Sequence, residues 1–335
     1  MMRAYSVILT FFVLVSSCDK PTTAPQEEHF LSNGVLIANE GNFQWGNASV
    51  SFYDFENDTV FEKVFQGVNQ RPLGDVLQSV NIQGDKAYLI LNNSGTIEVV
   101  DKNSFELEGT ISGFTSPRYI QITSSSKAYV TDLYADKIAI VDLNAKSITG
   151  YIDCVGWTEE MVQIDDLVYV VNLEDHTIYI INHESDEIID TFQFDFTINS
   201  LKKDNQDRLW VCGNEDGLGR VICIDTSTKT ELYSYAFEGE NPTDLFVTEQ
   251  GHDVYFLSNG VWHINEFTDE IIMSPIIPSE GRLFYGLSVN DDKIYIADAI
   301  NYVQKGTVWI YDFQTTLLDE WEVGIIPSEF DFIEE

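Results

Sequence analysis

The sequence predicts an all-β fold, a seven-bladed β-propeller of four-stranded antiparallel blades, and two repeated markers predict it. An aromatic residue recurs inside an apolar run with gaps of 41, 40, 41, 45 and 40 residues, at Tyr88, Tyr129, Tyr169, Trp210, Tyr255 and Tyr295. An apolar run that ends in Asp or Asn recurs at Asp54, Asp101, Asp142, Asn182, Asp225, Asn265 and Asp312. Periods of about forty residues are typical of arrays in which each repeat buries its faces against its neighbours. The second marker gives seven copies.

One repeat shows the content of a blade most clearly. It consists of four short runs rich in β-branched and aromatic residues, 118–122, 127–131, 137–142 and 147–153. Such runs, separated by turn residues, are typical of an antiparallel sheet. We name its strands A to D, from the centre of the ring outward. We expect the recurring Tyr or Trp in the core between blades, and the recurring Asp or Asn in an Asx turn between strands C and D.

The phase of the repeat predicts how the ring closes. The chain enters the first blade at a B strand (34–39), continues through C (48–54) and D (59–65), and has no A strand before them. The C-terminal segment 327–333 matches the entry into the other A strands. We therefore expect the last strand to complete blade one, which leaves the ring without an open edge.

The N-terminus resembles an export signal. After Arg3 comes a twelve-residue apolar run, 4–15, too short to span a membrane, then Ser16, Ser17 and Cys18, and then a polar stretch. Small residues before a Cys are typical of the bacterial lipobox. We expect a signal peptide at 1–17, a lipidated tether at 18–29 with the lipid on Cys18, and a single propeller at 30–335. The protein would be lipid-anchored in the outer membrane and exposed at the cell surface. An ordinary signal peptide with a chance Cys is the alternative.

The composition excludes some partners. The chain has 55 acidic and 18 basic side chains and a formal net charge of −37. Phosphate binding needs concentrated Lys and Arg, so we expect no nucleic-acid partner, and contact with a membrane only through the lipid anchor. With 44% apolar and 13% aromatic residues, the chain is nevertheless one that packs a core.

The candidate site lies in the loops that join strands D to A and B to C, which emerge together on one face, here called the top face. Scarce Arg residues, exposed aromatic residues and amides gather in these loops, a combination suited to a polar ligand with apolar patches. The candidate ligand-binding residues are Phe43, Trp45, Arg71, Asn93, Arg118, Tyr119, Asp132, Tyr134, Trp157, Arg282 and Tyr302. The alternative is that each Arg only neutralises a neighbouring carboxylate, such as Asp75 or Asp132.

Catalytic motifs are not found in the sequence. It has no His-Glu-x-x-His, Gly-x-Ser-x-Gly, phosphate loop or Cys-x-x-Cys, so we expect no enzyme, no catalytic residue, no metal and no cofactor. The segment 214–217 is interpreted as a polar hairpin loop, with a calcium site as the alternative. Cys212 and Cys223 lie on adjacent strands and form either a disulfide or two buried thiols.

Several segments resemble a known family. They are Asn39–Phe43, Arg71–Ser79, Asn92–Asp101, Ser116–Tyr119, Lys127–Asp136 and Gly156–Met161. These segments are similar to those of the YncE-like seven-bladed surface lipoproteins of Bacteroidota, in particular the cobalamin-binding BtuG type. The resemblance implies a lipoprotein that captures a corrinoid such as cobalamin and delivers it to a TonB-dependent outer-membrane transporter. Open alternatives are another cargo (glycan, haem or siderophore), a propeller lactonase or lyase with a channel metal, and a protein-docking scaffold.

Overall fold

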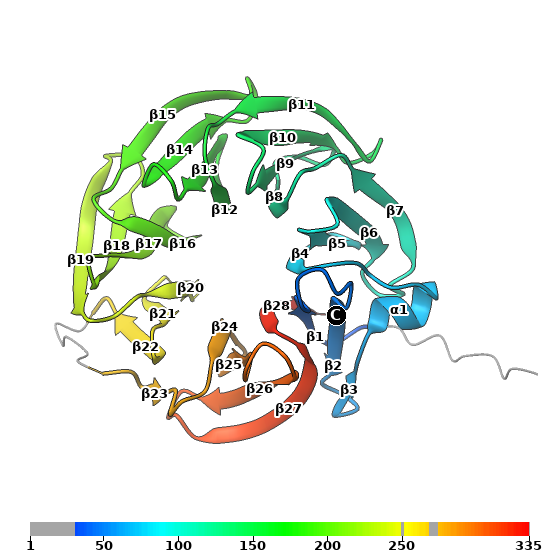
Figure 1. Ribbon diagram of the computed structural model, residues 1–335. Coiled ribbons are helices and arrows are strands. Elements are labelled where there is room, and N and C mark those ends of the chain that lie inside the picture. Colours follow the sequence, from blue (N-terminus) through cyan, green and yellow to red (C-terminus); the bar gives the residue numbers. More distant parts are fainter. Residues whose placement is uncertain (1–30, 249–250, 268–273, 335) are drawn as a thin grey trace, which may run out of the picture.

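The computed structural model describes residues 31–248, 251–267 and 274–334 and confirms the predicted architecture. Seven four-stranded antiparallel sheets stand in a ring, with strand A of each blade nearest the central axis (Figure 1). The predicted signal peptide, the lipidated Cys18 and the tether lie outside the described residues.

The blades follow one another in chain order. Blade 1 consists of β28 (Pro327–Ile333), β1 (Gly34–Asn39), β2 (Ser49–Asp54) and β3 (Thr59–Phe61). Blade 2 consists of β4 (Leu77–Gln83), β5 (Lys86–Leu91), β6 (Thr96–Asp101) and β7 (Leu107–Ser112). Blade 3 consists of β8 (Pro117–Ile122), β9 (Lys127–Asp132), β10 (Lys137–Asp142) and β11 (Ser147–Asp153). Blade 4 consists of β12 (Thr158–Ile164), β13 (Leu167–Asn172), β14 (Thr177–Asn182) and β15 (Glu187–Gln193).

The remaining three blades keep the same order of strands. Blade 5 consists of β16 (Thr197–Lys203), β17 (Arg208–Glu215), β18 (Leu218–Asp225) and β19 (Thr230–Glu238). Blade 6 consists of β20 (Thr243–Val247), β21 (Asp253–Leu257), β22 (Gly260–Asn265) and the short β23 (Ile277–Pro278). Blade 7 consists of β24 (Phe284–Asn290), β25 (Lys293–Asp298), β26 (Lys305–Asp312) and β27 (Leu317–Ile325).

Ring closure takes the predicted form. The C-terminal strand β28 pairs antiparallel with β1, from Pro327 opposite Asn39 to Ile333 opposite Gly34. The first and last parts of the chain thus share one sheet, and blade 1 lies between blades 7 and 2 (Figure 1).

The two repeated markers have the predicted structural roles. The six recurring aromatic residues are buried, with exposed fractions of 0 to 5%. Tyr88 of blade 2, for example, packs in one apolar cluster with Ile120 and Val130 of blade 3. In the C–D turn of blade 3, Asp142 Oδ1 accepts hydrogen bonds from the backbone N–H groups of Asn144 and Ala145, each at 2.8 Å.

The outer strand of blade 1 is shorter than predicted. The sequence predicts strand D over 59–65, whereas β3 ends at Phe61 and a short helix, α1 (Val64–Asn69), follows. Val64 and Phe65 are buried in the cluster between blades 1 and 2, which they reach because the chain turns inward here. Among the described residues no helix is long and apolar enough to cross a membrane.

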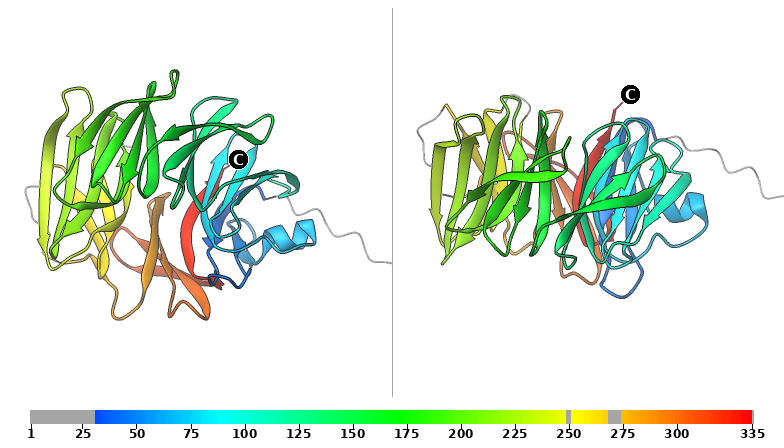
Figure 2. Two further views of the ribbon diagram at one scale, coloured as in Figure 1. Left: turned by 45° about the horizontal axis from the view of Figure 1, so that its top comes forward. Right: turned by 90° about the horizontal axis from the view of Figure 1, so that it is seen from above.

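The two faces of the ring differ in their loops. The D–A and B–C loops form the top face, and the A–B and C–D turns form the opposite face, here called the bottom face. The C-terminus emerges from the bottom face, which is uppermost in the right-hand view of Figure 2. The first described residue, Leu31, also lies there, because its backbone N–H donates to the carbonyl of Asn103 in a C–D turn.

Candidate functional site

The candidate site is the central channel and its mouth on the top face. A cavity of about 500 Å³ occupies the channel, and all seven blades contribute to its lining. The polar residues of its lining include Glu40, Gln78, Arg118, Tyr119, Glu160, Asn199, Lys202, Asp244, Tyr285, Ser328 and Glu329. Most of them stand on the A strands, whose edge-on arrangement points alternate side chains toward the axis.

Arg118, on β8, organises one side of the mouth. Its Nε donates to Glu159 Oε1 at 2.8 Å, and its guanidinium also bonds Gln78 of blade 2. Trp157 donates from its indole N–H to the same Glu159 carboxylate, and its ring lies 5.9 Å from the Arg118 guanidinium carbon. Arg118, Glu159 and Trp157 are thus held together at the rim. Nε and Nη1 of the guanidinium already donate hydrogen bonds within the protein.

Glu40 and Tyr285 contribute the part of the channel lining that comes from blades 1 and 7. The hydroxyl of Tyr285 bonds the Glu40 carboxylate, and burial raises the pKa of Glu40 to about 7. Tyr285 in turn packs edge-on against Tyr302, with ring centroids 5.7 Å apart. The side chain of Asn42 donates to the carbonyl of Tyr302, so the long B–C loops of blades 1 and 7 are joined across the closure.

Deeper in the channel, carboxylates link neighbouring blades. Glu329 Oε2 accepts the backbone N–H of Val80 at 2.7 Å, and Glu160 Oε2 accepts that of Leu201 at 2.6 Å. Lys202 Nζ lies 2.8 Å from the other Glu160 oxygen. Burial raises the pKa of Glu329 to about 8.

Two side-chain oxygens of residues that line the channel lack a hydrogen-bond partner among the described residues. Asp244 Oδ2 and Ser328 Oγ are buried and have no hydrogen-bond partner within 31–248, 251–267 and 274–334. Burial, partly opposed by the nearby Lys202, raises the pKa of Asp244 to about 7. Both atoms are closed off from solvent in this structure, so a donor reaches them only if the channel wall moves.

The structure brings some of the sequence-predicted site residues together. Arg118, Tyr119, Trp157 and Tyr302 lie at or around the channel mouth. Phe43, Trp45 and Tyr134 project from top-face loops with exposed fractions of 62, 78 and 72%.

The remaining predicted residues have partners within their own blades. Arg71 pairs with Glu98 at 2.9 Å, and Asn93 donates to Asp75 at 2.7 Å. Arg282 stacks on Trp309, 4.4 Å from the ring centroid, and donates to the hydroxyl of Tyr311.

Asp132 has a loop-holding role. Its Oδ2 accepts the backbone N–H groups of Thr115 and Ser116, which fixes the D–A loop of blade 3 against the end of β9. The alternative interpretation of the sequence is that each Arg neutralises a neighbouring carboxylate. The structure shows this contact for Arg71, with Glu98 as the carboxylate.

Sequence reasoning missed the charged residues of the channel wall. Glu159, Glu160, Lys202, Asp244 and Glu329 all stand on A strands. The sequence does show charged residues in the A strands, which lie nearest the axis. Single charges in short strands also occur on solvent-exposed edges, so the charges alone do not predict a channel wall. Only the register between blades distinguishes the two cases.

The structure decides between the alternatives for the cysteines and for the segment 214–217. Cys154, Cys212 and Cys223 are free, buried thiols, so the disulfide alternative for Cys212 and Cys223 is excluded. The segment around Asp216 and Gly217 is the predicted hairpin turn between β17 and β18. Within the described ranges, no three His, Cys, Asp or Glu side chains converge to hold a metal ion.

A family model matches residues 33–261 of the chain, well over half of its length. The model is that of DUF5074, described as a domain of unknown function. The chain belongs to this family. The matched segment runs from β1 in blade 1 to the start of β22 in blade 6. The closing strand β28 lies outside it.

Solved structures share the fold of this DUF5074 protein at low sequence identity. A quinoprotein alcohol dehydrogenase-like protein from Bacteroides thetaiotaomicron matches with a TM-score of 0.75 and 15% identity, over 91% of this chain and 79% of that one. A protein from Desulfotomaculum acetoxidans matches with a TM-score of 0.69 and 12% identity, over 90% and 99%. The dihydro-heme d1 dehydrogenase NirN matches with a TM-score of 0.61 and 10% identity, over 93% and 77%. No curated protein matches the chain. These structures share the β-propeller fold with this chain.

Proposed function

We propose that this protein is a cell-surface lipoprotein that captures a corrinoid on the top face and delivers it to a TonB-dependent outer-membrane transporter, without chemistry of its own. The observation that carries the proposal is the set of exposed rings on that face. They are Phe43, Trp45, Tyr134, Trp157, Tyr285 and Tyr302, each 38 to 78% exposed. Exposed aromatic surface gathered around a mouth is typical of a binding site.

The chemistry of the mouth suits a corrinoid. Cobalamin is a large flat macrocycle whose rim carries amide side chains, so it needs rings to stack against and acceptors for its amide N–H groups. The rings around Trp157 and Tyr302 supply the first, and the carboxylates of Glu40 and Glu159 with the amide of Gln78 supply the second. Affinity in such a site is spread over many hydrogen bonds and stacked planes.

The buried polar atoms of the channel support the same proposal. Asp244 and Ser328 belong to the channel lining, and their oxygens Asp244 Oδ2 and Ser328 Oγ have no partner among the described residues. We propose that the channel wall moves on binding, so that amide N–H groups of the ligand reach these buried acceptors. A ligand with a long amide arm could place such a group in the channel while its macrocycle stays at the mouth.

The positions of the two faces fit delivery to a partner. The described chain starts at Leu31 on the bottom face, so the predicted tether would leave from the side opposite the mouth. The top face would then be free to meet a transporter, and the two long loops at residues 40–48 and 299–304 would lie at the contact.

The proposal is tested by calorimetric titration of the purified protein with cyanocobalamin. We expect binding in the wild type and a loss of about tenfold in affinity, or ~1.4 kcal/mol, for each of Trp45→Ala, Trp157→Ala and Arg118→Ala. Tyr151→Ala is the matched control, because Tyr151 is 46% exposed but lies on the outer strand β11.

Three outcomes would reject parts of the proposal. No heat with cyanocobalamin at micromolar protein rejects the corrinoid. Affinities within twofold of wild type for all three variants reject the top face as the site. Equal losses for Tyr151→Ala and the three top-face variants attribute the effect to general destabilisation, which melting temperatures of the same samples would reveal.

A further inference from the structure

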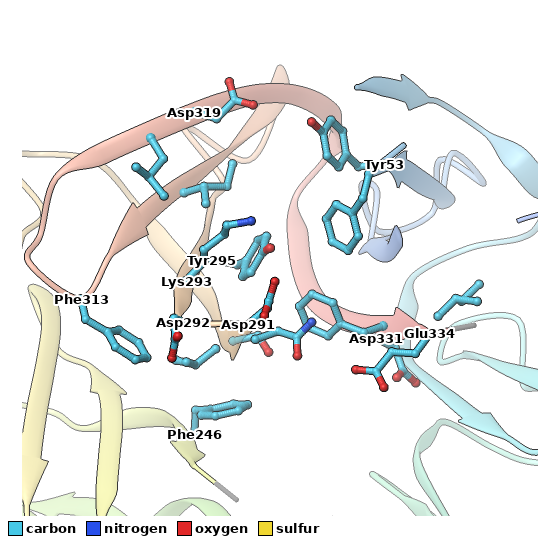
Figure 3. A pocket seen from close by; sticks show the side chains of 18 of the residues that line it. Tyr53, Phe246, Asp291, Asp292, Lys293, Tyr295, Phe313, Asp319, Asp331 and Glu334 are labelled. Atoms are coloured by element: carbon cyan, nitrogen blue, oxygen red, sulfur yellow. The ribbon is translucent and has the colours of Figure 1, made fainter. Parts of the chain in front are cut away.

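A second cavity, separate from the channel mouth, opens on the bottom face. Its volume is about 1070 Å³, and it lies over the A–B turn of blade 7, between blades 6 and 1 (Figure 3). Small-molecule sites span about 300–1,000 Å³, so this cavity has room for an elongated ligand.

The charge of the cavity is strongly negative. Six carboxylates line it and a single Lys, Lys293, opposes them, which leaves a formal excess of five negative charges. The carboxylates are those of Asp253, Asp291, Asp292, Asp319, Asp331 and Glu334. Low-dielectric walls around charges of one sign concentrate counter-ions of the opposite sign.

Several of these carboxylates already have partners. Asp253 accepts from the ring of His263 at 2.7 Å, Asp319 from the indole of Trp321 at 2.8 Å, and Asp331 from the backbone N–H of Ile82 at 2.7 Å.

The two central carboxylates differ from these. The side chains of Asp291 and Asp292 form no hydrogen bond or ion pair with any residue that the structure describes, and both residues are exposed. Figure 3 places them between Phe313 and Asp331, with Tyr295 and Phe246 on either side. The free negative charge thus stands in the middle of the cavity.

Aromatic side chains share the lining of the cavity with the carboxylates, and Phe313 is the most exposed of them. Tyr53, Phe55, Phe246, Tyr295, Phe313, Trp321 and Phe332 line the same space. Phe313 is 39% exposed and stacks on Tyr255 with centroids 6.0 Å apart, which holds its ring in place. Ring faces attract ammonium groups and cover alkyl chains, so they extend the attraction for a cation between the carboxylates.

From this geometry we infer that the bottom cavity binds a linear polyamine, a chain of methylene groups that carries several separated ammonium groups. Its ammonium groups pair with Asp291, Asp292 and the acids of the rim, and its methylene groups lie on the rings. A compact metal ion suits the cavity less well, because the carboxylates come from different strands and do not converge on one point. This inference is independent of the function proposed for the top face.

Calorimetric titration with spermine at low salt tests the inference. We expect one site per protein, and a loss of about tenfold in affinity for the double variant Asp291→Asn with Asp292→Asn. The matched control is Glu184→Gln with Glu187→Gln, which removes two exposed charges from the bottom face in blade 4, away from the cavity. Phe313→Leu keeps apolar bulk but removes the ring, and we expect it to weaken binding severalfold.

Each remaining outcome contradicts the inference. No binding of spermine by the wild type overturns it. An equal loss in the two double variants shows general attraction to an acidic protein rather than a site. Unchanged affinity in Phe313→Leu removes the role of the rings, and with it the cavity as the place of binding.

Discussion

Burial and hydrogen bonding shift the pKa of Glu329 in opposite directions, and burial has the larger effect. Its carboxylate joins blade 1 to blade 2 through the N–H of Val80, yet burial raises its pKa to about 8. Asp244 and Asp331 follow the same pattern, each with a pKa raised to about 7. In the unfolded chain these groups ionise near pH 4, so between about pH 4 and 8 the folded state binds more protons than the unfolded state. Stability contributed by these groups is therefore lost as the pH rises through this range.

Glu329→Gln should flatten this dependence. The amide oxygen still accepts the N–H of Val80 but does not titrate, and each tenfold difference in proton affinity is worth about 1.4 kcal/mol. We expect the melting temperature of the variant, relative to that of the wild type, to increase by at least a few °C between pH 5 and pH 8.5. Parallel curves for the two proteins would contradict the argument. Glu187→Gln, at the exposed first residue of β15, serves as the control and should follow the wild type.

At the scale of elements, β28 is the strand on which the ring depends. It pairs with β1 along its whole length, and its Glu329 and Asp331 also bond the backbone of β4 in the next blade. Removal of this strand would expose the edge of β1 and the apolar cluster that contains Ile333.

Deletion of residues 327–335 should therefore abolish cooperative unfolding. We expect a broad transition with a calorimetric enthalpy that exceeds the van't Hoff enthalpy, because blades would then unfold separately. Deletion of Glu334 and Glu335 alone, beyond the paired residues, is the control. A sharp transition at the wild-type temperature after the longer deletion would show that the closure contributes little.

The repeat explains how much of the fold could be predicted. Tyr129 and its equivalents recur because each blade buries the same position, and Asp142 recurs because each C–D turn needs the same acceptor. Helix α1 occurs once among the described residues, so the repeat could not predict it, and its Val64 and Phe65 pack into the cluster between blades 1 and 2. The sequence could predict which face carries the candidate site, but not which of its residues line the mouth. Arg118 and Trp157 meet at the mouth, whereas Arg71 pairs with Glu98, a contact that only the side-chain packing reveals.

For the whole molecule, the proposed tether raises the question of which face of the propeller would point away from the membrane. The net charge of −37 is not spread only over outer turns, because carboxylates also line the channel and the bottom cavity. With a like-charged surface on most sides, the protein would be held near an anionic membrane by a covalent anchor and not by its own surface. In the proposed tethered protein, Cys18 is the residue on which localisation would depend.

Cys18→Ala should remove the anchor. We expect wild-type protein to incorporate a fatty-acid label and the variant to incorporate none, because acylation needs the thiol. Cys154→Ala is the matched control, since Cys154 is a buried thiol within the propeller and its loss should leave the label unchanged. An antibody against the Tyr134 loop, applied to intact cells, then reports the orientation. If the proposed tether leaves near Leu31 on the bottom face, the top face should be accessible to the antibody in cells that lack the proposed transporter. Label in Cys18→Ala, or a top face that only permeabilised cells reveal, would contradict a tethered propeller that presents its mouth outward.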